Sequence, residues 1–363
     1  MSGPLSGLKI IEMAGIGPAP FTAMLLADLG AEVVRVERPN QTDPLGMPPA
    51  FDILLRGRQR LVANLKDPAD QDCLWSLIEG ADALIEGFRP GVMERLGFGP
   101  DAVQAHNPKL VYGRMTGWGQ SGPYADRAGH DLNYLGLTGA VMSFGPADGP
   151  PWPPLNLAAD FGGGGMYLAF GLLAAIMEAR ETGHGQVVDA AMVDGASLLM
   201  SMAYGMNSAG FTPNPRGGNL LDGGAPFYAC YECRDGGYLT VCPLEPQFYA
   251  AFVERADLAE HPAFARQYDQ KSWPAMKTAL TEMFMTQDRD YWANLFSDVD
   301  ACVFPALELD EVKDHPHNSA RQTHANIDGA LHPMPGPRFG ADNIPDAAPV
   351  QTDHTKISEF KGW

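Results

Sequence analysis

The stretch Leu8-Lys9-Ile10-Ile11-Glu12-Met13 has the apolar pattern of a buried β-strand, and a turn at residues 15–20 follows it. Residues 21–29 predict a helix that Gly30 ends. Glu32-Val33-Val34-Arg35-Val36-Glu37 is then a second strand, rich in β-branched residues. A strand, a helix and another strand in this order predict a parallel sheet that helices cover.

The same alternation continues along the chain. Further strands are expected at residues 60–65, Ala83–Glu86 and 110–114, with a helix at residues 67–80. A loop rich in proline and glycine at residues 144–154 precedes an apolar helix, which we expect at residues 166–181. A methionine-rich stretch at residues 196–210 also has a helical pattern.

The chain changes character near residue 225. Two segments with strand patterns flank Arg234-Asp235-Gly236-Gly237, which predicts a hairpin. Helices are expected at residues 247–255, 273–286 and 289–296. The predicted fold class is therefore α/β, with a large domain on a parallel sheet and a smaller α+β domain. We place the first part of the large domain at 1–190, a linker at 191–224, the small domain at 225–310 and a return to the large domain at 311–363.

The composition is that of a folded, acidic protein. Of its 363 residues 45% are hydrophobic, and 44 acidic against 25 basic residues give a formal net charge of −19. That charge opposes binding to nucleic acid or to an anionic membrane surface. The N-terminus lacks the pattern of a signal peptide. The longest apolar run, residues 166–177, is shorter than the roughly 20 residues that span a bilayer. We expect a soluble, cytoplasmic protein.

Two familiar motifs are incomplete. Gly15-Ile16-Gly17 resembles the start of a dinucleotide-binding turn, and Glu37 stands where an acid would bind ribose. Pro18 has no N–H for a phosphate and Pro20 replaces the third glycine, so we interpret the segment as a strand-to-helix turn. The lone CxxC, Cys230 to Cys233, has no second pair, so we expect structural thiols and no metal.

Basic residues gather at or near the predicted carboxyl ends of the strands. They are Arg38, Arg56, Arg58, Arg60, Lys66, Arg89, Arg95 and Arg114. In an open parallel sheet that edge forms the ligand crevice, and guanidinium groups suit a phosphorylated anion. About half of these side chains fit solvated surface arginines equally well.

The strongest catalytic candidates are His130 and Asp160. His130 lies in Gly129-His130-Asp131-Leu132-Asn133-Tyr134, outside any apolar helical stripe, and an imidazole titrates near neutral pH. Asp160 stands directly before Phe161-Gly162-Gly163-Gly164-Gly165. An aspartate there can cap a helix, but four glycines exceed what a cap needs. They would leave backbone amides open to an oxyanion, so the two residues suggest removal and return of a proton.

These residues, together with further motifs, resemble the family III CoA-transferases and the racemases related to them. The matching segments are Leu5-Ser6-Gly7-Leu8-Lys9, Ala14-Gly15-Ile16-Gly17-Pro18, Ala27-Asp28-Leu29-Gly30-Ala31-Glu32-Val33-Val34-Arg35-Val36-Glu37-Arg38-Pro39, Glu86-Gly87-Phe88-Arg89-Pro90-Gly91-Val92, Arg114-Met115-Thr116-Gly117-Trp118-Gly119-Gln120, the two segments around His130 and Asp160, Gly185-Gln186-Val187-Val188-Asp189 and Leu244-Glu245-Pro246-Gln247-Phe248-Tyr249. The resemblance covers most of the chain and weakens after about Arg338. Together the motifs are highly specific for the family.

The resemblance implies an interlocked homodimer of chains that each have a Rossmann-like large domain and a small domain. The active site would lie between the large domain of one chain and the small domain of the other. Coenzyme A would bind as part of the substrate, without a prosthetic group. The positions that match the family's CoA-binding residues, or surround His130, are Arg38, Ala63, Asn64, Leu65, Lys66, Gly87, Phe88, Arg89, Arg95, Gly129, Asp131, Leu132, Asn133 and Tyr134.

Within the family, the residues favour racemases that act on 2-methyl-branched acyl-CoA. In the transferases the aspartate that matches Asp160 is a nucleophile, and the Gly-His-Asp motif is generally missing. The racemases keep a histidine that matches His130 and a glutamate that matches Glu245. The resemblance thus implies 1,1-proton transfer through an enolate, with His130 and Asp160 as the two bases and Glu245 orienting His130. Asn156 and Tyr134 are supporting candidates.

Two alternatives stay open. The first is a family III CoA-transferase that uses Asp160 as its nucleophile. The second is a CoA-binding protein without turnover. The acyl chain is also open, because Met142, Met192, Met200, Met202 and Met206 fit a plain core at least as well as an adaptable apolar surface.

Overall fold

The computed structural model describes residues 3–40, 46–340 and 346–363, which form two compact units. Unit 1 contains Met1–Thr138, Pro154–Met200 and His315–Trp363, and unit 2 contains Gly139–Pro153 and Ser201–Asp314. The predicted linker at 191–224 is therefore divided at Met200, and the loop at residues 139–153 belongs to unit 2 rather than to the large domain.

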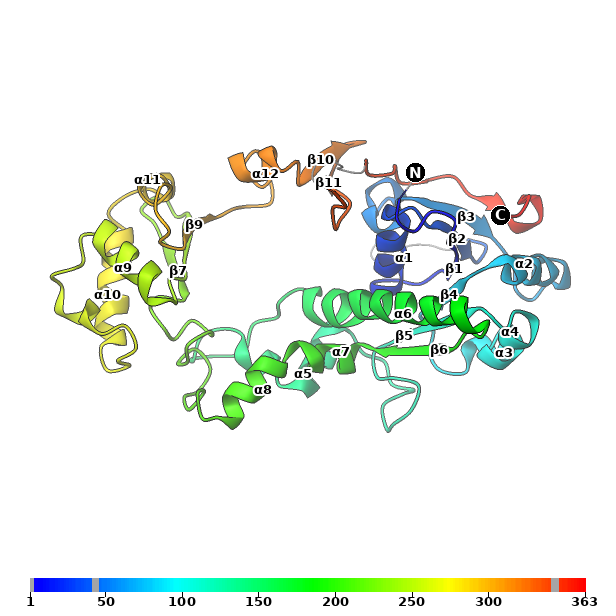
Figure 1. The fold of residues 1–363 in the computed structure, drawn as a ribbon, viewed down its shortest axis with the longest axis horizontal. Helices are drawn as coiled ribbons and strands as arrows, with labels where there is room; N and C mark the ends of the chain where they lie inside the picture. The colour runs from blue at the N-terminus through cyan, green and yellow to red at the C-terminus, as the bar shows by residue number, and fades with distance from the viewer. Residues whose placement is uncertain (1–2, 41–45, 341–345) are drawn as a thin grey trace. The chain divides into compact units, whose positions relative to one another are not determined.

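A seven-stranded, fully parallel sheet forms the centre of unit 1. Its strands are β1 (Lys9–Met13), β2 (Glu32–Glu37), β3 (Arg58–Val62), β4 (Ala83–Glu86), β5 (Val111–Thr116), β6 (Val187–Ala191) and β12 (Thr355–Lys356). They lie in the order β12-β3-β2-β1-β4-β5-β6 (Figure 1). The strand order reverses between β1 and β4, which is where ligands bind in open α/β sheets.

The predicted parallel sheet is confirmed, with differences at its edges. β3 begins at Arg58 and ends at Val62 instead of spanning residues 60–65, so residues 63–66 follow its carboxyl end. The edge strands β6 and β12 were not expected from the sequence. β12 has only two residues and pairs with Leu61 and Val62, a contact that local sequence does not encode.

Helices cover both faces of the sheet. They include α1 (Pro18–Asp28), α2 (Pro68–Gly80), α3 (Val92–Arg95), α4 (Pro100–His106) and α6 (Tyr167–Thr182). On one face, Ile11 and Val34 pack in an apolar cluster with Leu77 of α2 and Val103 of α4. Side chains alternate along a strand, so Glu12 points to the opposite face. Helices α1 and α6 contact the strands as well (Figure 1).

The glycine run lies in an unusual helix. Residues Leu157–Met166 form a π-helix that continues directly into α6. The expected helix at 166–181 therefore begins nine residues earlier, and Leu157–Thr182 spans 26 residues with the length and composition of a membrane span. Core helices of soluble proteins share that composition, and Leu168, Leu172 and Ile176 of α6 are buried. π-Helical turns are frequent at functional sites.

Short helices complete unit 1 around this segment. They are α5 (Asp131–Thr138), α7 (Met192–Leu199) and α12 (Pro316–Ala320), and the hairpin β10 (His324–Ile327) and β11 (Ala330–Pro333) follows α12. Both α5 and α7 contact the π-helix.

Unit 2 has the expected α+β character. The predicted hairpin is confirmed as β7 (Ala229–Glu232) and β8 (Tyr238–Val241), and β9 (Val303–Ala306) adds a third antiparallel strand. The helices are α8 (Ser201–Ser208), α9 (Pro246–Arg255), α10 (Trp273–Phe284) and α11 (Arg289–Leu295). Phe227, Phe252 and Phe284 are fully buried in one aromatic-rich core.

Candidate active site

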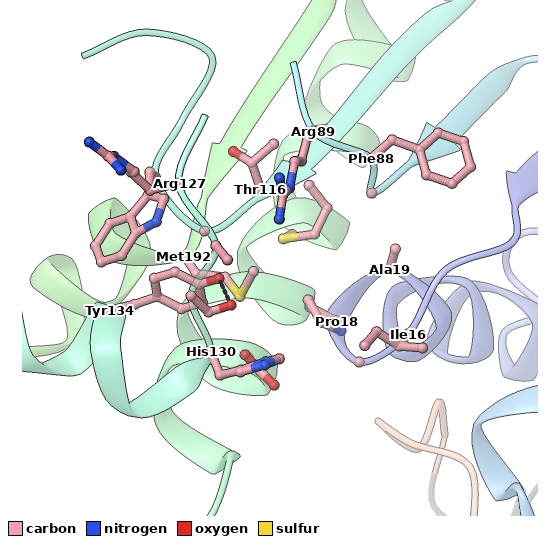
Figure 2. Close-up of a pocket in the computed structure, with 18 of the residues that line it drawn as sticks. Ile16, Pro18, Ala19, Phe88, Arg89, Thr116, Arg127, His130, Tyr134 and Met192 are labelled. Atoms are coloured by element: carbon pink, nitrogen blue, oxygen red, sulfur yellow. Dashed lines mark hydrogen bonds between the residues drawn. The ribbon is translucent and has the colours of Figure 1, made fainter. Parts of the chain in front are cut away.

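A cavity of about 420 Å³ lies at the switch point of the sheet in unit 1. Three of the loops that line it follow the carboxyl ends of β1, β4 and β5. The lining residues include Ile16, Gly17, Pro18, Ala19, Gly87, Phe88, Arg89, Thr116, Trp118, Arg127, Gly129, His130, Tyr134, Asp160 and Met192 (Figure 2). The structure thus brings His130 and Asp160 into one cavity.

His130 is held by its backbone while its side chain stays exposed. Its carbonyl oxygen accepts the N–H groups of Asn133 at 2.8 Å and of Tyr134 at 3.3 Å, which begins helix α5. Its own N–H donates to Oδ1 of Asn133 at 3.1 Å. In Figure 2 the imidazole points toward the turn that carries Ile16 and Pro18. The ring is therefore free to meet a substrate, while its main chain is fixed.

Asp160 lies in the first turn of the π-helix and is half-buried. Nδ2 of Asn156 lies 3.4 Å from its Oδ2, and a Cβ at Gly17 would lie 3.5 Å from the same oxygen. Burial raises the pKa of Asp160 to about 6; the Asn156 hydrogen bond opposes this, the charge of Asp131 adds to it and that of His130 opposes it. The carboxyl is thus poised between its acid and base forms near neutral pH, as an acid/base catalyst requires.

The glycine run has a different role from the one expected. Gly163, Gly164 and Gly165 are buried, and a Cβ at Gly163 would lie 2.4 Å from the backbone nitrogen of Ala196 on α7. A Cβ at Gly165 would lie 2.5 Å from the Phe21 ring on α1. The glycines therefore let three helices approach closely and do not leave their amides open to a ligand.

An aromatic scaffold supports the His130 segment. The Tyr134 hydroxyl donates to the carbonyl oxygen of Gly129, and the rings of Tyr134 and Trp118 meet edge to face at 4.7 Å. A Cβ at Gly129 would lie 2.8 Å from Tyr134, so only glycine fits before His130. Burial, with the charges of Asp160 and Asp131, raises the pKa of Tyr134 to about 12. Tyr134 is therefore a neutral structural donor.

A second cavity, of about 540 Å³, adjoins the first and shares Ile16, Gly87 and Phe88 with it. It is lined by the expected CoA-binding residues that follow β2, β3 and β4, namely Arg38, Ala63, Asn64, Leu65, Lys66, Gly87 and Phe88. The shift in the end of β3 places residues 63–66 in this crevice. Arg89 lines the first cavity. Arg95 is exposed on α3 and lines neither cavity.

The anion-binding interpretation is wrong for four of the basic residues. Arg56 pairs with Asp28, Arg58 with Glu12, Arg60 with Glu37 and Arg114 with Glu86 and Glu94. Arg35 joins Glu12 and Glu37 in the same network and donates to the carbonyl oxygen of Gly15 at 3.1 Å. Arg56 and Arg58 are each only 1% exposed. These guanidinium groups hold strands and the β1–α1 turn together instead of facing a phosphate.

Asp131, Leu132 and Asn133, which were expected to contact a ligand, do not line the cavity. The side chain of Asp131 is buried and accepts the N–H groups of Ala159 and Asp160, and the side chain of Asn133 accepts the N–H of His130. Leu132 is exposed but does not line the cavity. Sequence reasoning in turn missed Trp118 and Arg127 as lining residues. The motif Gly117-Trp118-Gly119 marked the first of these, and no pattern marked Arg127.

Glu245 lies in unit 2, exposed, at the residue before α9. Its carbonyl oxygen accepts the N–H of Tyr249 at 2.9 Å, so its backbone belongs to the start of the helix. Within the described ranges no hydrogen bond holds its carboxylate. The expected role of Glu245 beside His130 stays a prediction.

The model of the CoA-transferase family III matches residues 5–355. The chain is 41% identical to the alpha-methylacyl-CoA racemase of Mus musculus, over 92% of this chain and 85% of that protein. It is 41% identical to the alpha-methylacyl-CoA racemase of Homo sapiens, over 87% and 81% of the two chains. A crystal structure of a CAIB/BAIF family protein from Brucella suis superposes with a TM-score of 0.81 at 25% identity, over 99% of this chain and 97% of that chain. The chain belongs to CoA-transferase family III.

Proposed function

We propose that the protein is an isomerase that epimerises the 2-methyl centre of branched acyl-CoA thioesters. The observation that carries the proposal is the placement of an exposed imidazole, His130, and of a carboxyl with a pKa of about 6, Asp160, in one cavity. A reaction that removes a proton from one face of a carbon and returns it to the other needs two such groups.

The reaction follows from these two side chains. One base takes the α-proton, the C–H bond breaks and its electron pair moves to the thioester oxygen, which gives a planar enolate. The opposite group then donates its proton to the other face of the α-carbon, and the carbonyl re-forms. In the reverse direction His130 and Asp160 exchange roles. No prosthetic group takes part in this scheme.

The enolate oxygen needs donors, and the buried glycines are poor candidates. The start of α5 is a better candidate, because this helix begins at Asp131, directly after the cavity residue His130. Amides at a helix start favour negative charge. The coenzyme A part would occupy the second cavity, where Arg38 and Lys66 give local positive charge in a chain of net charge −19.

A homodimer with Glu245 of one chain beside His130 of the other is part of the proposal. It is supported by an apolar face of α6 on which Phe170 is 73% exposed and Met177 is 69% exposed. Exposed apolar surface of this kind commonly marks an interface. We also propose a cytoplasmic location. The acidic charge opposes binding to nucleic acid or to an anionic membrane, so we propose neither as a partner.

The test is deuterium wash-in at C2 of (2R)- and (2S)-2-methylacyl-CoA, followed by mass spectrometry. We expect both epimers to exchange and interconvert with the unmodified protein. His130→Ala and Asp160→Asn should each abolish proton abstraction from a different epimer while CoA binding persists. Exchange of both epimers at unchanged rates in either variant would contradict the two-base scheme.

The transferase alternative predicts a different product. Asp160 would form a covalent acyl anhydride that hydroxylamine traps, and turnover would require a free carboxylic acid as acceptor. A protein that only binds CoA would show neither the adduct nor exchange with any acyl-CoA tested. Exchange without an acceptor and without an adduct supports the racemase.

A further inference from the structure

Asp131 connects the two candidate catalytic residues. It is the first residue of α5, directly after His130, and it is only 4% exposed. Its Oδ2 accepts two backbone hydrogen bonds, from the N–H of Ala159 and from the N–H of Asp160, both at 2.8 Å. A single carboxylate oxygen thus joins the segment that carries His130 to the turn that carries Asp160.

The other oxygen of this carboxylate is unusual. Oδ1 of Asp131 is buried and has no hydrogen-bond partner among the described residues. A buried, incompletely paired carboxylate is costly, and asparagine or serine would cap the same amides without that cost. The chain therefore keeps a negative charge at this position beyond what the two hydrogen bonds require.

That charge acts on Asp160. The causes of the raised pKa of Asp160 include the Asp131 charge, after burial and the opposing Asn156 hydrogen bond, and His130 acts in the opposite direction. Tyr134 of α5 is also titratable and lies within reach of both carboxylates. The atoms of α1 and α7 nearest to an added Cβ at Gly163, Gly164 or Gly165 belong to uncharged residues, namely Pro18, Phe21, Met192, Gly195 and Ala196.

We propose that Asp131 is a positioning residue of this site, which fixes the backbone of Asp160 relative to His130 and places a negative charge against the Asp160 carboxyl. The inference rests on the proposed two-base reaction. It assigns the Asp131 side chain to the catalytic machinery and not to contacts with coenzyme A.

Two variants separate the effect of Asp131 on the position of the Asp160 backbone from the effect of its negative charge. Asp131→Asn keeps an acceptor oxygen for the two amides and removes the charge, so the Asp160 carboxyl should ionise at lower pH. For the epimer whose proton Asp160 removes, we expect the acid limb of the pH–rate profile to move down by about one pH unit. Asp131→Ala removes the acceptor as well and should lower the exchange rate on the order of 100-fold.

Asp126→Asn is the matched control. It removes one negative charge from an exposed position in the loop that precedes His130. Its pH profile should be that of the unmodified protein. Circular dichroism and calorimetric binding of coenzyme A establish that each variant is folded.

A titration of the Asp160 carboxyl by ¹³C NMR gives a readout that needs no turnover. A lower pKa in Asp131→Asn than in the unmodified protein supports the inference. An unchanged Asp160 titration in Asp131→Asn overturns it, and so does full exchange activity in a folded Asp131→Ala. Absence of exchange in the unmodified protein would overturn the proposed reaction instead, and the NMR result would still decide what Asp131 does.

Discussion

Nδ2 of Asn156 lies 3.4 Å from Oδ2 of Asp160, one turn apart at the start of the π-helix. A donor at this position stabilises the ionised carboxylate, and it lowers the pKa that burial raises. Asn156 thus opposes the effect of Asp131 on the same group. Burial is the largest cause of the raised pKa of Asp160, and these two neighbours shift that pKa in opposite directions.

Removal of that donor should move the pH dependence upward. In Asn156→Ala the pKa of Asp160 rises above about 6, because the ionised form loses its hydrogen bond. The rate for the epimer that Asp160 deprotonates should then begin to rise at higher pH, by roughly half a unit to one unit. Initial rates of deuterium wash-in between pH 5 and 8 measure this shift. A profile that coincides with that of the unmodified protein would show that the contact has no electrostatic effect.

Asp160 should reduce stability at neutral pH. Its pKa is about 6 in the folded chain and 3.8 in its ordinary state, so the unfolded chain loses this proton first as pH rises. The resulting cost is absent below pH 3.8 and complete above pH 6. We expect Asp160→Asn to raise the free energy of unfolding by about 2 kcal/mol at pH 8, and by less at pH 4.5. Urea unfolding at both pH values checks this; an equal gain at both would point to packing.

The glycine run should tolerate no side chain on its α7 face. In Gly163→Ala the new methyl group meets the backbone of Ala196, which cannot move alone, and we expect a loss of about 3 kcal/mol. Gly205→Ala is the matched control, because Gly205 lies in helix α8 with nothing within 4 Å of the added Cβ. That change should stabilise by about 0.5 to 1 kcal/mol. Thermal or urea unfolding of both variants tests the contrast, and similar effects would refute the packing role.

Substitution of a buried arginine should reduce stability more than substitution of an exposed one. Arg58→Met leaves Glu12 without one of its two buried partners, so we expect a loss of about 3 kcal/mol or more. Arg234→Met removes a pair with Asp288 in which both side chains are about half exposed, and its loss of stability should be much smaller. Urea unfolding compares the two. Equal losses would contradict the assignment of Arg58 to a structural network.

Arg89→Met should leave the stability nearly unchanged but weaken the binding of coenzyme A. Arg89 is exposed at the first cavity, so stability should change by less than about 0.5 kcal/mol while the Kd for coenzyme A rises about 10-fold. Calorimetric titration with coenzyme A measures the affinity. Unchanged affinity would remove Arg89 from the binding site.

Local patterns in the sequence determined the parallel sheet, the hairpin and the two motifs around His130 and Asp160. β-Branched strands, glycine turns and helix stops are properties of neighbouring residues, so they can be recognised without the fold. The strand ends could be placed only approximately, as β3 illustrates, because Arg58 joins the strand by pairing with Val33, far away in the chain. The residue types connected His130 with Asp160 as a possible acid/base pair, and the resemblance to the family then added coenzyme A and Glu245.

Only the tertiary structure decided which basic side chains line the crevice and what the glycines do. Arg58 resembles Arg38 in the sequence, but it meets Glu12, 46 residues earlier, inside the sheet, whereas Arg38 lines the crevice. From the sequence, the backbone amide of Gly163 was expected to be open to a ligand. In the fold, the backbone of Ala196 packs against Gly163 instead. Likewise, Asp131 reaches the amide of Asp160 across 29 residues. The burial and the ion pairing of a side chain depend on partners that are distant along the chain. Burial and pairing in turn determine the pKa of the side chain and whether it can contact a ligand.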